Sequence, residues 1–222
     1  MRSHFIVLDT PRFDLRTGVV KVAERAMRHP PSLSWRTSLR NHVGGMVSVD
    51  FFVVPTAAFR LLFVFIVLHH ERRRIVHFGI TTNPTSTWTA QQIREDFPWD
   101  TAPGWLIRDR DGSYGAAFRS RLQALGINEV LTAPRSPWQN AYAERVIGSI
   151  RRECLDHVIV LSAGHLHRLL TSYVAYYHES RTHLSLGKDC PEPRPIQASG
   201  SGKIVALPQV GGLHHRYERL AA

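Results

Sequence analysis

Cysteine is scarce in this chain, which removes two common ways of stabilising a small protein. Cys154 and Cys190 are the only two cysteines among 222 residues. A disulfide framework needs several cysteine pairs, and a structural zinc site needs a C-x-x-C pair or histidines at fixed spacings. The 13 histidines do not show those spacings. The sequence therefore excludes a disulfide-stapled protein and the familiar zinc modules, and it fits a reducing cytoplasm.

Long apolar runs are missing as well. The most apolar run spans residues 61–68, far short of the ~20 residues that a membrane-spanning helix needs, and Arg60 precedes it. A buried strand is the better interpretation of this run. Charged residues interrupt the first 20 positions, where a secretory signal would need an apolar stretch: Asp9, Arg12, Asp14 and Arg16. We therefore expect a cytoplasmic protein without a membrane partner.

Acidic residues are few, and lysines are fewer. The chain has 18 acidic and 28 basic residues, a formal net charge of +10 and an isoelectric point near 10.4. Only Lys21, Lys188 and Lys203 are lysines. Such a basic chain favours an anionic partner, and nucleic acid is the commonest one. The planar fork of arginine suits phosphate, although a GC-rich genome would also enrich arginine without any functional cause.

The hydrophobic pattern predicts one α/β domain. Hydrophobic residues make up 43% of the chain, which is enough for a single sizeable core. Three apolar runs with short connections predict an antiparallel meander, after which helices and strands alternate. The expected strands are 46–54, 59–68, 73–81, 104–109 and 127–132, and the expected helices are 85–97, 116–126, one that starts at Pro137, and 163–180. This order indicates a mixed α/β domain.

Two flanking segments have weaker patterns, so we divide the chain into three parts. Residues 1–45 form a short, irregular lead-in, in which only 20–28 has the pattern of a helix. Residues 46–186 form the α/β domain. Residues 187–222 are a linker rich in proline and glycine, followed by a short basic tail.

Three acidic residues lie where regular structure predicts rigid, partly buried positions. Asp50 lies inside the first strand, Asp109 ends the fourth, and Glu144 lies on the helix that follows. A buried carboxylate needs a cation, and either an arginine or a metal ion can supply the charge. Carboxylates at the ends of neighbouring strands and on a packed helix can converge on one point. Such a set suits Mg²⁺ and in-line phosphoryl displacement.

The three acidic motifs together carry a resemblance to a known family. The stretches "VDFFVV" around Asp50, "LIRDRDG" around Asp109 and "APRSPWQNAYAERVIGSIRRE" around Glu144 resemble the catalytic core of DDE transposases and retroviral-type integrases, especially bacterial insertion-sequence transposases. The second and third acids are separated by 34 residues, close to the family spacing. The resemblance covers about residues 35–190.

The resemblance implies a fold, a cofactor and partners. It implies an RNase H-like mixed five-stranded sheet flanked by helices. It also implies that Asp50, Asp109 and Glu144 are catalytic and bind two Mg²⁺ or Mn²⁺ ions. The expected partners are the DNA of element ends and targets and further copies of the chain, in a multimer on DNA. The expected location is the bacterial cytoplasm, in association with the nucleoid.

The chain departs from the family pattern at two places. Where the family usually has Asp-Asn-Gly, this chain has Asp109, Arg110, Asp111 and Gly112, so Asp111 is an alternative ligand. We choose Asp109 because it follows the apolar strand with one arginine between and has the better spacing to Glu144. Asp111 is expected to shape the turn before the glycine. The lead-in 1–45 is too short and irregular for the complete helix-turn-helix region that similar transposases place ahead of the core.

The stretch around Glu144 predicts a well-defined helix. Ser136 is suited to the N-cap, Pro137 to the first helical position, and Gln139 to the last position of a capping box. An apolar stripe contains Ala143, Ile147, Ile150 and Cys154, and a polar stripe contains Arg145, Ser149, Arg152 and Asp156. The apolar stripe should face the core.

Residues around the acids are candidates for DNA contacts. Arginines could bind phosphates, and aromatic side chains could contact bases or sugars. The candidates are Arg110, Arg135, Trp138, Asn140, Arg145, Arg151 and Arg152. The alternative for each arginine is an ordinary solvated helix face.

We interpret the chain as a transposase core that cuts DNA and joins the freed 3′-hydroxyl to a target. Two alternatives remain open. A nuclease of the same fold would cut without joining. A non-catalytic remnant would bind DNA or a full-length transposase and modulate its activity.

Overall fold

The computed structural model describes residues 44–98, 101–134 and 137–220. Its elements in the central domain are β1 (Met46–Pro55), β2 (Leu61–His69), β3 (Arg74–Thr81), α3 (Ser86–Asp96), β4 (Trp105–Arg108), α4 (Ala116–Ala124), β5 (Asn128–Leu131), α5 (Ala141–Glu153) and α6 (Ala163–Glu179). The helix expected over 20–28, together with Arg135 and Ser136, lies outside the described residues.

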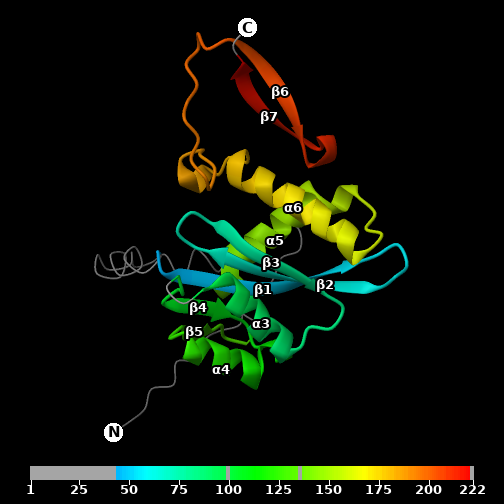
Figure 1. Ribbon diagram of the computed structural model, residues 1–222, viewed down its shortest axis with the longest axis vertical. Coiled ribbons are helices and arrows are strands. Elements are labelled where there is room, and N and C mark those ends of the chain that lie inside the picture. The colour runs from blue at the N-terminus through cyan, green and yellow to red at the C-terminus, as the bar shows by residue number, and fades with distance from the viewer. Residues whose placement is uncertain (1–43, 99–100, 135–136, 221–222) are drawn as a thin grey trace, which may run out of the picture. The chain divides into compact units, whose positions relative to one another are not determined.

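Five strands form one mixed sheet in the order β3-β2-β1-β4-β5. Strands β1, β2 and β3 pair in antiparallel fashion, as the meander prediction required, and β4 and β5 run parallel to β1. The parallel pairs follow from the intervening helices, because a strand can return in the same direction only after a crossover. The predicted mixed five-stranded sheet flanked by helices is confirmed (Figure 1).

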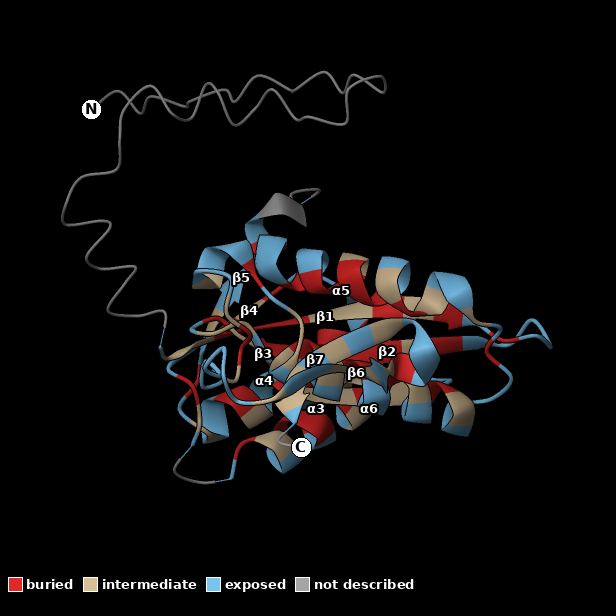
Figure 2. Ribbon diagram, turned by 90° about the horizontal axis from the view of Figure 1, so that it is seen from above, coloured by how far each residue is buried: buried red, intermediate tan, exposed pale blue. Residues whose placement is uncertain are grey.

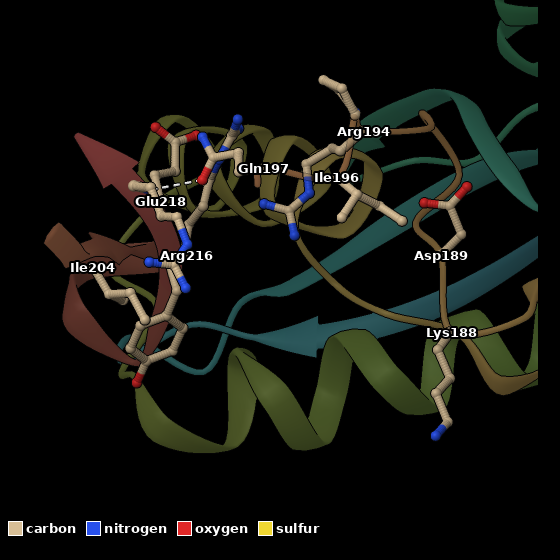
Figure 3. A pocket seen from close by; sticks show the side chains of 11 residues that line it. Lys188, Asp189, Arg194, Ile196, Gln197, Ile204, Arg216 and Glu218 are labelled. Carbon is tan, nitrogen blue, oxygen red and sulfur yellow. Dashed lines mark hydrogen bonds and ion pairs between the residues drawn. The ribbon is translucent and has the colours of Figure 1, made fainter. Parts of the chain in front are cut away.

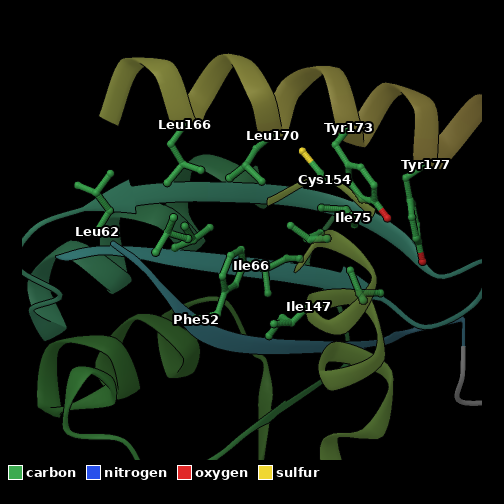
Figure 4. Packing of buried hydrophobic residues seen from close by; sticks show 14 of the residues in the cluster. Phe52, Leu62, Ile66, Ile75, Ile147, Cys154, Leu166, Leu170, Tyr173 and Tyr177 are labelled. Atoms are coloured by element: carbon green, nitrogen blue, oxygen red, sulfur yellow. The ribbon is translucent and has the colours of Figure 1, made fainter. Parts of the chain in front are cut away.

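Alternating residues of the central strands build a separate core on each face of the sheet. On β2, Leu62, Val64, Ile66 and Leu68 pack with residues of α5 and α6, as Figure 4 shows. The intervening Phe65 and Val67 pack on the opposite face with residues of α3 and α4. Because both faces are covered, β2 is apolar at nearly every position, which explains the run from 61 to 68.

Helix α5 follows its predicted stripe and begins later than predicted. Ala143, Val146, Ile147, Ile150 and Cys154 are all buried. Figure 2 shows that the buried side of α5 is turned toward β1. The helix starts at Ala141, after a 3₁₀ turn over Pro137–Asn140. Gln139 Oε1 accepts the Ala133 N–H at 2.7 Å, and its predicted capping-box partner Ser136 lies outside the described residues.

One residue of the predicted polar stripe is buried. The side chain of Ser149 is 4% exposed, and its Oγ accepts a hydrogen bond from Arg181 Nη2 at 3.4 Å. The segment after α6 therefore covers part of the face of α5 that the helical pattern assigned to solvent.

The C-terminal segment contains regular structure that the sequence pattern did not predict. Strands β6 (Lys203–Gln209) and β7 (His214–Leu220) pair in antiparallel fashion in a separate two-stranded sheet. Gly211 and Gly212 take positive φ angles of 65° and 91° at the turn, where glycine is favoured. The His214 ring stacks on Tyr176 of α6 with the centroids 4.3 Å apart. The basic tail is therefore a hairpin that contacts α6.

A membrane-spanning helix is not found in the part of the chain that the structure describes, because none of its helices is long and apolar enough.

Candidate active site

Asp50 lies on the face of β1 that α5 covers. It alternates with Phe52 and Val54, which pack in the same core as Ile147 of α5. Successive residues of a strand point to opposite faces, so the Asp50 carboxylate points toward the helix. Its Oδ1 accepts the Phe51 N–H at 2.7 Å.

Asp109 follows the last residue of β4, at the same edge of the sheet. The parallel register between β1 and β4 pairs Met46 with Trp105 and Ser48 with Ile107. The same register, carried two residues beyond the ladder, places Asp109 beside Asp50. Neighbouring strands lie about 4.8 Å apart, so this register sets Asp109, just past the end of β4, next to Asp50 in the middle of β1, and on the same face of the sheet.

Asp111 shapes the turn that holds Asp109. The Asp111 N–H donates to Asp109 Oδ1 at 3.0 Å, and Asp111 Oδ1 accepts the Ser113 N–H at 2.8 Å. Asp111 thereby caps the 3₁₀ turn over Gly112–Tyr114. This turn role agrees with the expectation from the sequence. Asp50, Asp109 and Asp111 also share the wall of one pocket of about 240 Å³.

Glu144 lies in the first turn of α5, one helical turn after Asn140. The Asn140 side chain is 5% exposed, and its Nδ2 donates to the Val49 carbonyl at 3.1 Å and to Asp50 Oδ2 at 3.4 Å. This pair of bonds ties the start of α5 to β1 beside Asp50. It turns the amide, which the sequence suggested as a DNA contact, toward the acid instead of solvent.

The carboxylate of Asp50 is the most enclosed of the acids, and the others lie within its electrostatic reach. The pKa of Asp50 is raised to about 7. Burial is the largest cause, the hydrogen bond from the Phe51 N–H lowers the pKa, and the negative charges of Glu144, Asp109 and Asp111 add smaller upward contributions. Among the described residues, no arginine or lysine forms an ion pair with Asp50, Asp109 or Glu144. The arginine partner that the sequence left open is therefore not found in this part of the chain.

The expectation that all three acids are partly buried is wrong for two of them. Asp109 and Glu144 are exposed, and only Asp50 has intermediate burial. The physical reason is their position: Asp109 lies just past a strand, and Glu144 lies in a first helical turn on the side away from the core. The candidate site therefore consists of two solvent-exposed carboxylates, those of Asp109 and Glu144, beside the more enclosed carboxylate of Asp50.

The carboxylates of Asp50, Asp109 and Glu144 are suitable ligands for a hard divalent cation, but they are not yet close enough together to bind one. Within the described ranges, no three His, Cys, Asp or Glu side chains are already close enough together to hold an ion. The acids nevertheless offer only oxygen donors, which Mg²⁺ prefers. Asn140 Oδ1 is buried beside an uncompensated Asp50 and has no hydrogen-bond partner among the described residues. A cation bound by these carboxylates would balance this excess of negative charge.

The arginines near the site serve different purposes. Arg110 Nε donates to the Thr132 carbonyl at 3.2 Å, and Arg151 Nη2 donates to the Val53 carbonyl at 3.2 Å, with its guanidinium over the Phe52 ring. Arg145 and Arg152 are exposed on α5. The predicted contact Arg135 lies outside the described residues, and so does the side chain of Trp138.

Arg108 is a site residue that sequence reasoning missed. It is buried, its Nη2 pairs with Glu129 at 2.6 Å, and its Nη1 donates to the Asp109 carbonyl at 2.7 Å. The guanidinium also lies over the Tyr114 ring. The sequence did contain an indication of this role. Arg108 ends an apolar strand, and a charge buried there needs a fixed partner. Arg108 holds the backbone that carries Asp109.

Comparison with known proteins agrees with this architecture. The integrase core domain family matches residues 125–191, which include Glu144 and helices α5 and α6. Among solved structures, a chain of the simian T-cell lymphotropic virus intasome aligns with a TM-score of 0.55 at 13% identity, over 78% of this chain and 66% of that one. The domain has the fold of integrase and transposase cores. The predicted resemblance to integrase and transposase cores is thereby confirmed.

Other relatives extend the comparison of this integrase-like core. The Mos1 transposase catalytic domain aligns with a TM-score of 0.54 at 14% identity, over 64% of this chain and 76% of that one. The BIV integrase core aligns at 0.50 and 13%, over 67% and 91%. An uncharacterised protein of insertion element IS476 from Xanthomonas euvesicatoria is 33% identical over 75 residues, 34% of this chain. The match spans 22% of that protein's length.

Proposed function

We propose that this chain is the catalytic core of an insertion-sequence transposase, which cuts a phosphodiester at an element end and joins the freed 3′-hydroxyl to target DNA. Asp50, Asp109 and Glu144 act together in both steps. The observation that carries the proposal is geometric. In an integrase-like fold, the register of β1 and β4 sets Asp109 beside Asp50, and Asn140, four residues before Glu144, donates to Asp50 Oδ2.

The chain's own residues fix the acids in place. Asn140 and the Phe51 N–H hold Asp50, while the Asp111 N–H and Arg108 hold Asp109 and its backbone. Glu144 approaches from α5, whose apolar stripe anchors it to the sheet. Rigid supports of this kind keep oxygen donors at fixed positions while the phosphate changes geometry.

A divalent cation, Mg²⁺ or Mn²⁺, held by these carboxylates supplies the positive charge that activates the attacking oxygen and stabilises the leaving one. We infer two such ions, because an in-line displacement has two oxygens to serve. The Mos1 transposase and HTLV-2 integrase structures, both named as complexes with magnesium, support a divalent cation in this fold.

DNA is the partner that the charge favours. The net charge of +10 suits a polyanion, and the exposed Arg145 and Arg152 lie on the same helix as Glu144. We infer that copies of the chain assemble on paired DNA ends. A chain with a similar fold is part of the simian T-cell lymphotropic virus intasome.

A branched DNA that mimics the joined product tests this proposal, because its resolution needs the chemical step without recognition of element ends. With Mg²⁺ or Mn²⁺, the wild type should resolve the branch, and the variants Asp50→Ala, Asp109→Ala and Glu144→Ala should each lose at least about 100-fold in rate. Asp111→Ala is the matched control, since it removes a neighbouring carboxylate that serves the turn.

Two results would overturn the assignment. Full activity in any of the three variants would remove that acid from the site, and loss of activity only in Asp111→Ala would transfer the role to Asp111. Cleavage of linear DNA without any joining would instead indicate the nuclease alternative. DNA binding without either reaction would indicate the non-catalytic alternative.

A further inference from the structure

A second pocket lies beside α5, outside the acidic site, and arginines dominate its wall. Its volume is about 250 Å³. Its charged and aromatic lining includes Arg73, Tyr142, Arg145, Arg152, Arg181 and His183. These residues come from the turn between β2 and β3, from α5, and from the segment at the end of α6. We call it the arginine pocket.

One face of α5 forms a wall of the arginine pocket. The residues of this face are spaced by three, four and three positions: Tyr142, Arg145, Ser149 and Arg152. At 3.6 residues per turn they share one stripe, which lies about a third of a turn from Glu144. The pocket and the candidate catalytic acid therefore occupy adjacent faces of one helix.

Gly148 leaves room for the guanidinium of Arg152. A Cβ at position 148 would lie 3.0 Å from Arg152 Nη1, which is a tight contact. Side chains on a helix lean toward its N-terminus, so Arg152 extends back over the glycine toward Arg145. Glycine in the middle of a helix costs about 1 kcal/mol relative to alanine, and here its missing side chain leaves this space to Arg152.

The other walls add two more arginines. The Arg73 guanidinium lies 4.8 Å from the centre of the Tyr142 ring. Arg181 is fixed by Glu153, with Nε–Oε2 and Nη2–Oε1 distances of 2.7 Å and 2.6 Å. Arg181 Nη1 also lies 3.2 Å from His183 Nδ1. Burial, then the charges of Arg181 and Arg73, lower the pKa of His183 to about 4, so this ring is neutral at physiological pH.

The positive charge of the pocket is poorly balanced. In the described part of the chain, Glu153 pairs with Arg181, and no ion pair involves Arg73, Arg145 or Arg152. The larger pocket in Figure 3 is different, because its Arg216 pairs with both Glu179 and Glu218 and its Arg219 Nη1 donates to the Gly202 carbonyl. Like charges gathered without counter-charge are costly unless an anion binds between them.

We propose that the arginine pocket binds a backbone phosphate of the DNA strand that passes Glu144. Several guanidinium groups around one space match the oxygens of a phosphate, and the exposed Tyr142 offers a ring for the neighbouring sugar or base. The arginine pocket thereby binds the strand on one face of α5, and Glu144 contacts the same strand from the adjacent face. This inference rests on the proposed DNA substrate.

The test is equilibrium binding of labelled duplex DNA in EDTA, which requires no catalysis. Arg145→Gln/Arg152→Gln should weaken binding roughly 10- to 100-fold at low salt. Its plot of log K against log salt concentration should be shallower by about 0.9 for each phosphate that the variant no longer neutralises. Arg94→Gln/Arg119→Gln, which removes two exposed arginines from α3 and α4, is the control and should keep the wild-type slope more closely.

Three further outcomes decide the proposal. If the double variant unfolds, Arg73→Gln replaces it, because this residue belongs to a different element and should give the same decrease in slope. Equal decreases in the pocket and control variants would overturn the proposal in favour of diffuse attraction. Unchanged DNA binding with altered sedimentation would also overturn it and make the pocket an interface between copies.

The outcome is separable from that of the proposed function. Weakened binding in the pocket variants, together with a wild-type protein that never joins DNA, would support the pocket and refute the catalytic proposal. Normal joining of DNA by the pocket variants would support the catalytic proposal and refute the role of the arginine pocket.

Discussion

Replacement of Asp50 by asparagine should change how stability depends on pH when divalent cations are absent. The pKa of Asp50 is raised from its ordinary value of 3.8 to about 7 in the folded protein, chiefly because of burial. The folded state therefore binds this proton more tightly than the unfolded state. The resulting stabilisation is fully present below about pH 4 and is lost as pH rises through 7.

The magnitude follows from the two pKa values. With these two pKa values, the contribution of Asp50 to the free energy of unfolding falls by about 2.6 kcal/mol between pH 5 and pH 8. Asparagine keeps the shape and the bond from the Phe51 N–H but does not titrate, so Asp50→Asn should gain stability relative to the wild type by about that amount over the same range. Other groups, such as Asp96, titrate in both proteins and cancel in the comparison.

Urea unfolding in EDTA at several pH values between 5 and 8 measures this difference. Added Mg²⁺ at pH 8 should stabilise the wild type and not the variant, because only the wild type presents the charged ligand. If the difference in unfolding free energy between the wild type and Asp50→Asn stays constant with pH, Asp50 is not buried without a counter-charge and the reasoning is refuted.

Two other substitutions test the supports of the site. Asn140→Ala should leave Asp50 less firmly held. It should lower Mg²⁺ affinity and the rate of branch resolution by about 10- to 100-fold, with little change in DNA affinity. Unchanged Mg²⁺ affinity in a calorimetric titration would argue against this role of Asn140. Glu153→Ala should cost about 3 kcal/mol in urea unfolding, because it leaves Arg181 without its carboxylate and Tyr173 without its acceptor. Glu179→Ala should cost less than about 1 kcal/mol, because it removes only one of the two carboxylates that pair with Arg216.

The sheet could be predicted because the signal lies within each segment, but its division of the interior into two cores was not predicted, since the composition indicated a single core. The continuous apolar run over β2 indicates a strand covered on both faces, and the glycine after α4 ends that helix as expected. The convergence of Asp50 and Asp109 also follows from the sequence once the two strands are taken as parallel neighbours.

Other features depend on contacts between distant segments. The burial of Ser149 needs the segment after α6, and the contact of the C-terminal hairpin with α6 needs the stacking of His214 on Tyr176. Asn140 could not be distinguished from a DNA contact by its type alone. Its role beside Asp50 emerges only when the turn before α5 is placed against β1.

The most direct test of the central claim is an anomalous difference map from crystals of the protein soaked in Mn²⁺. The account predicts manganese peaks bounded by the carboxylates of Asp50, Asp109 and Glu144, and their disappearance in Asp50→Asn crystals. Saturating Mn²⁺ without a peak at these carboxylates, or with a peak that persists in the variant, would contradict it.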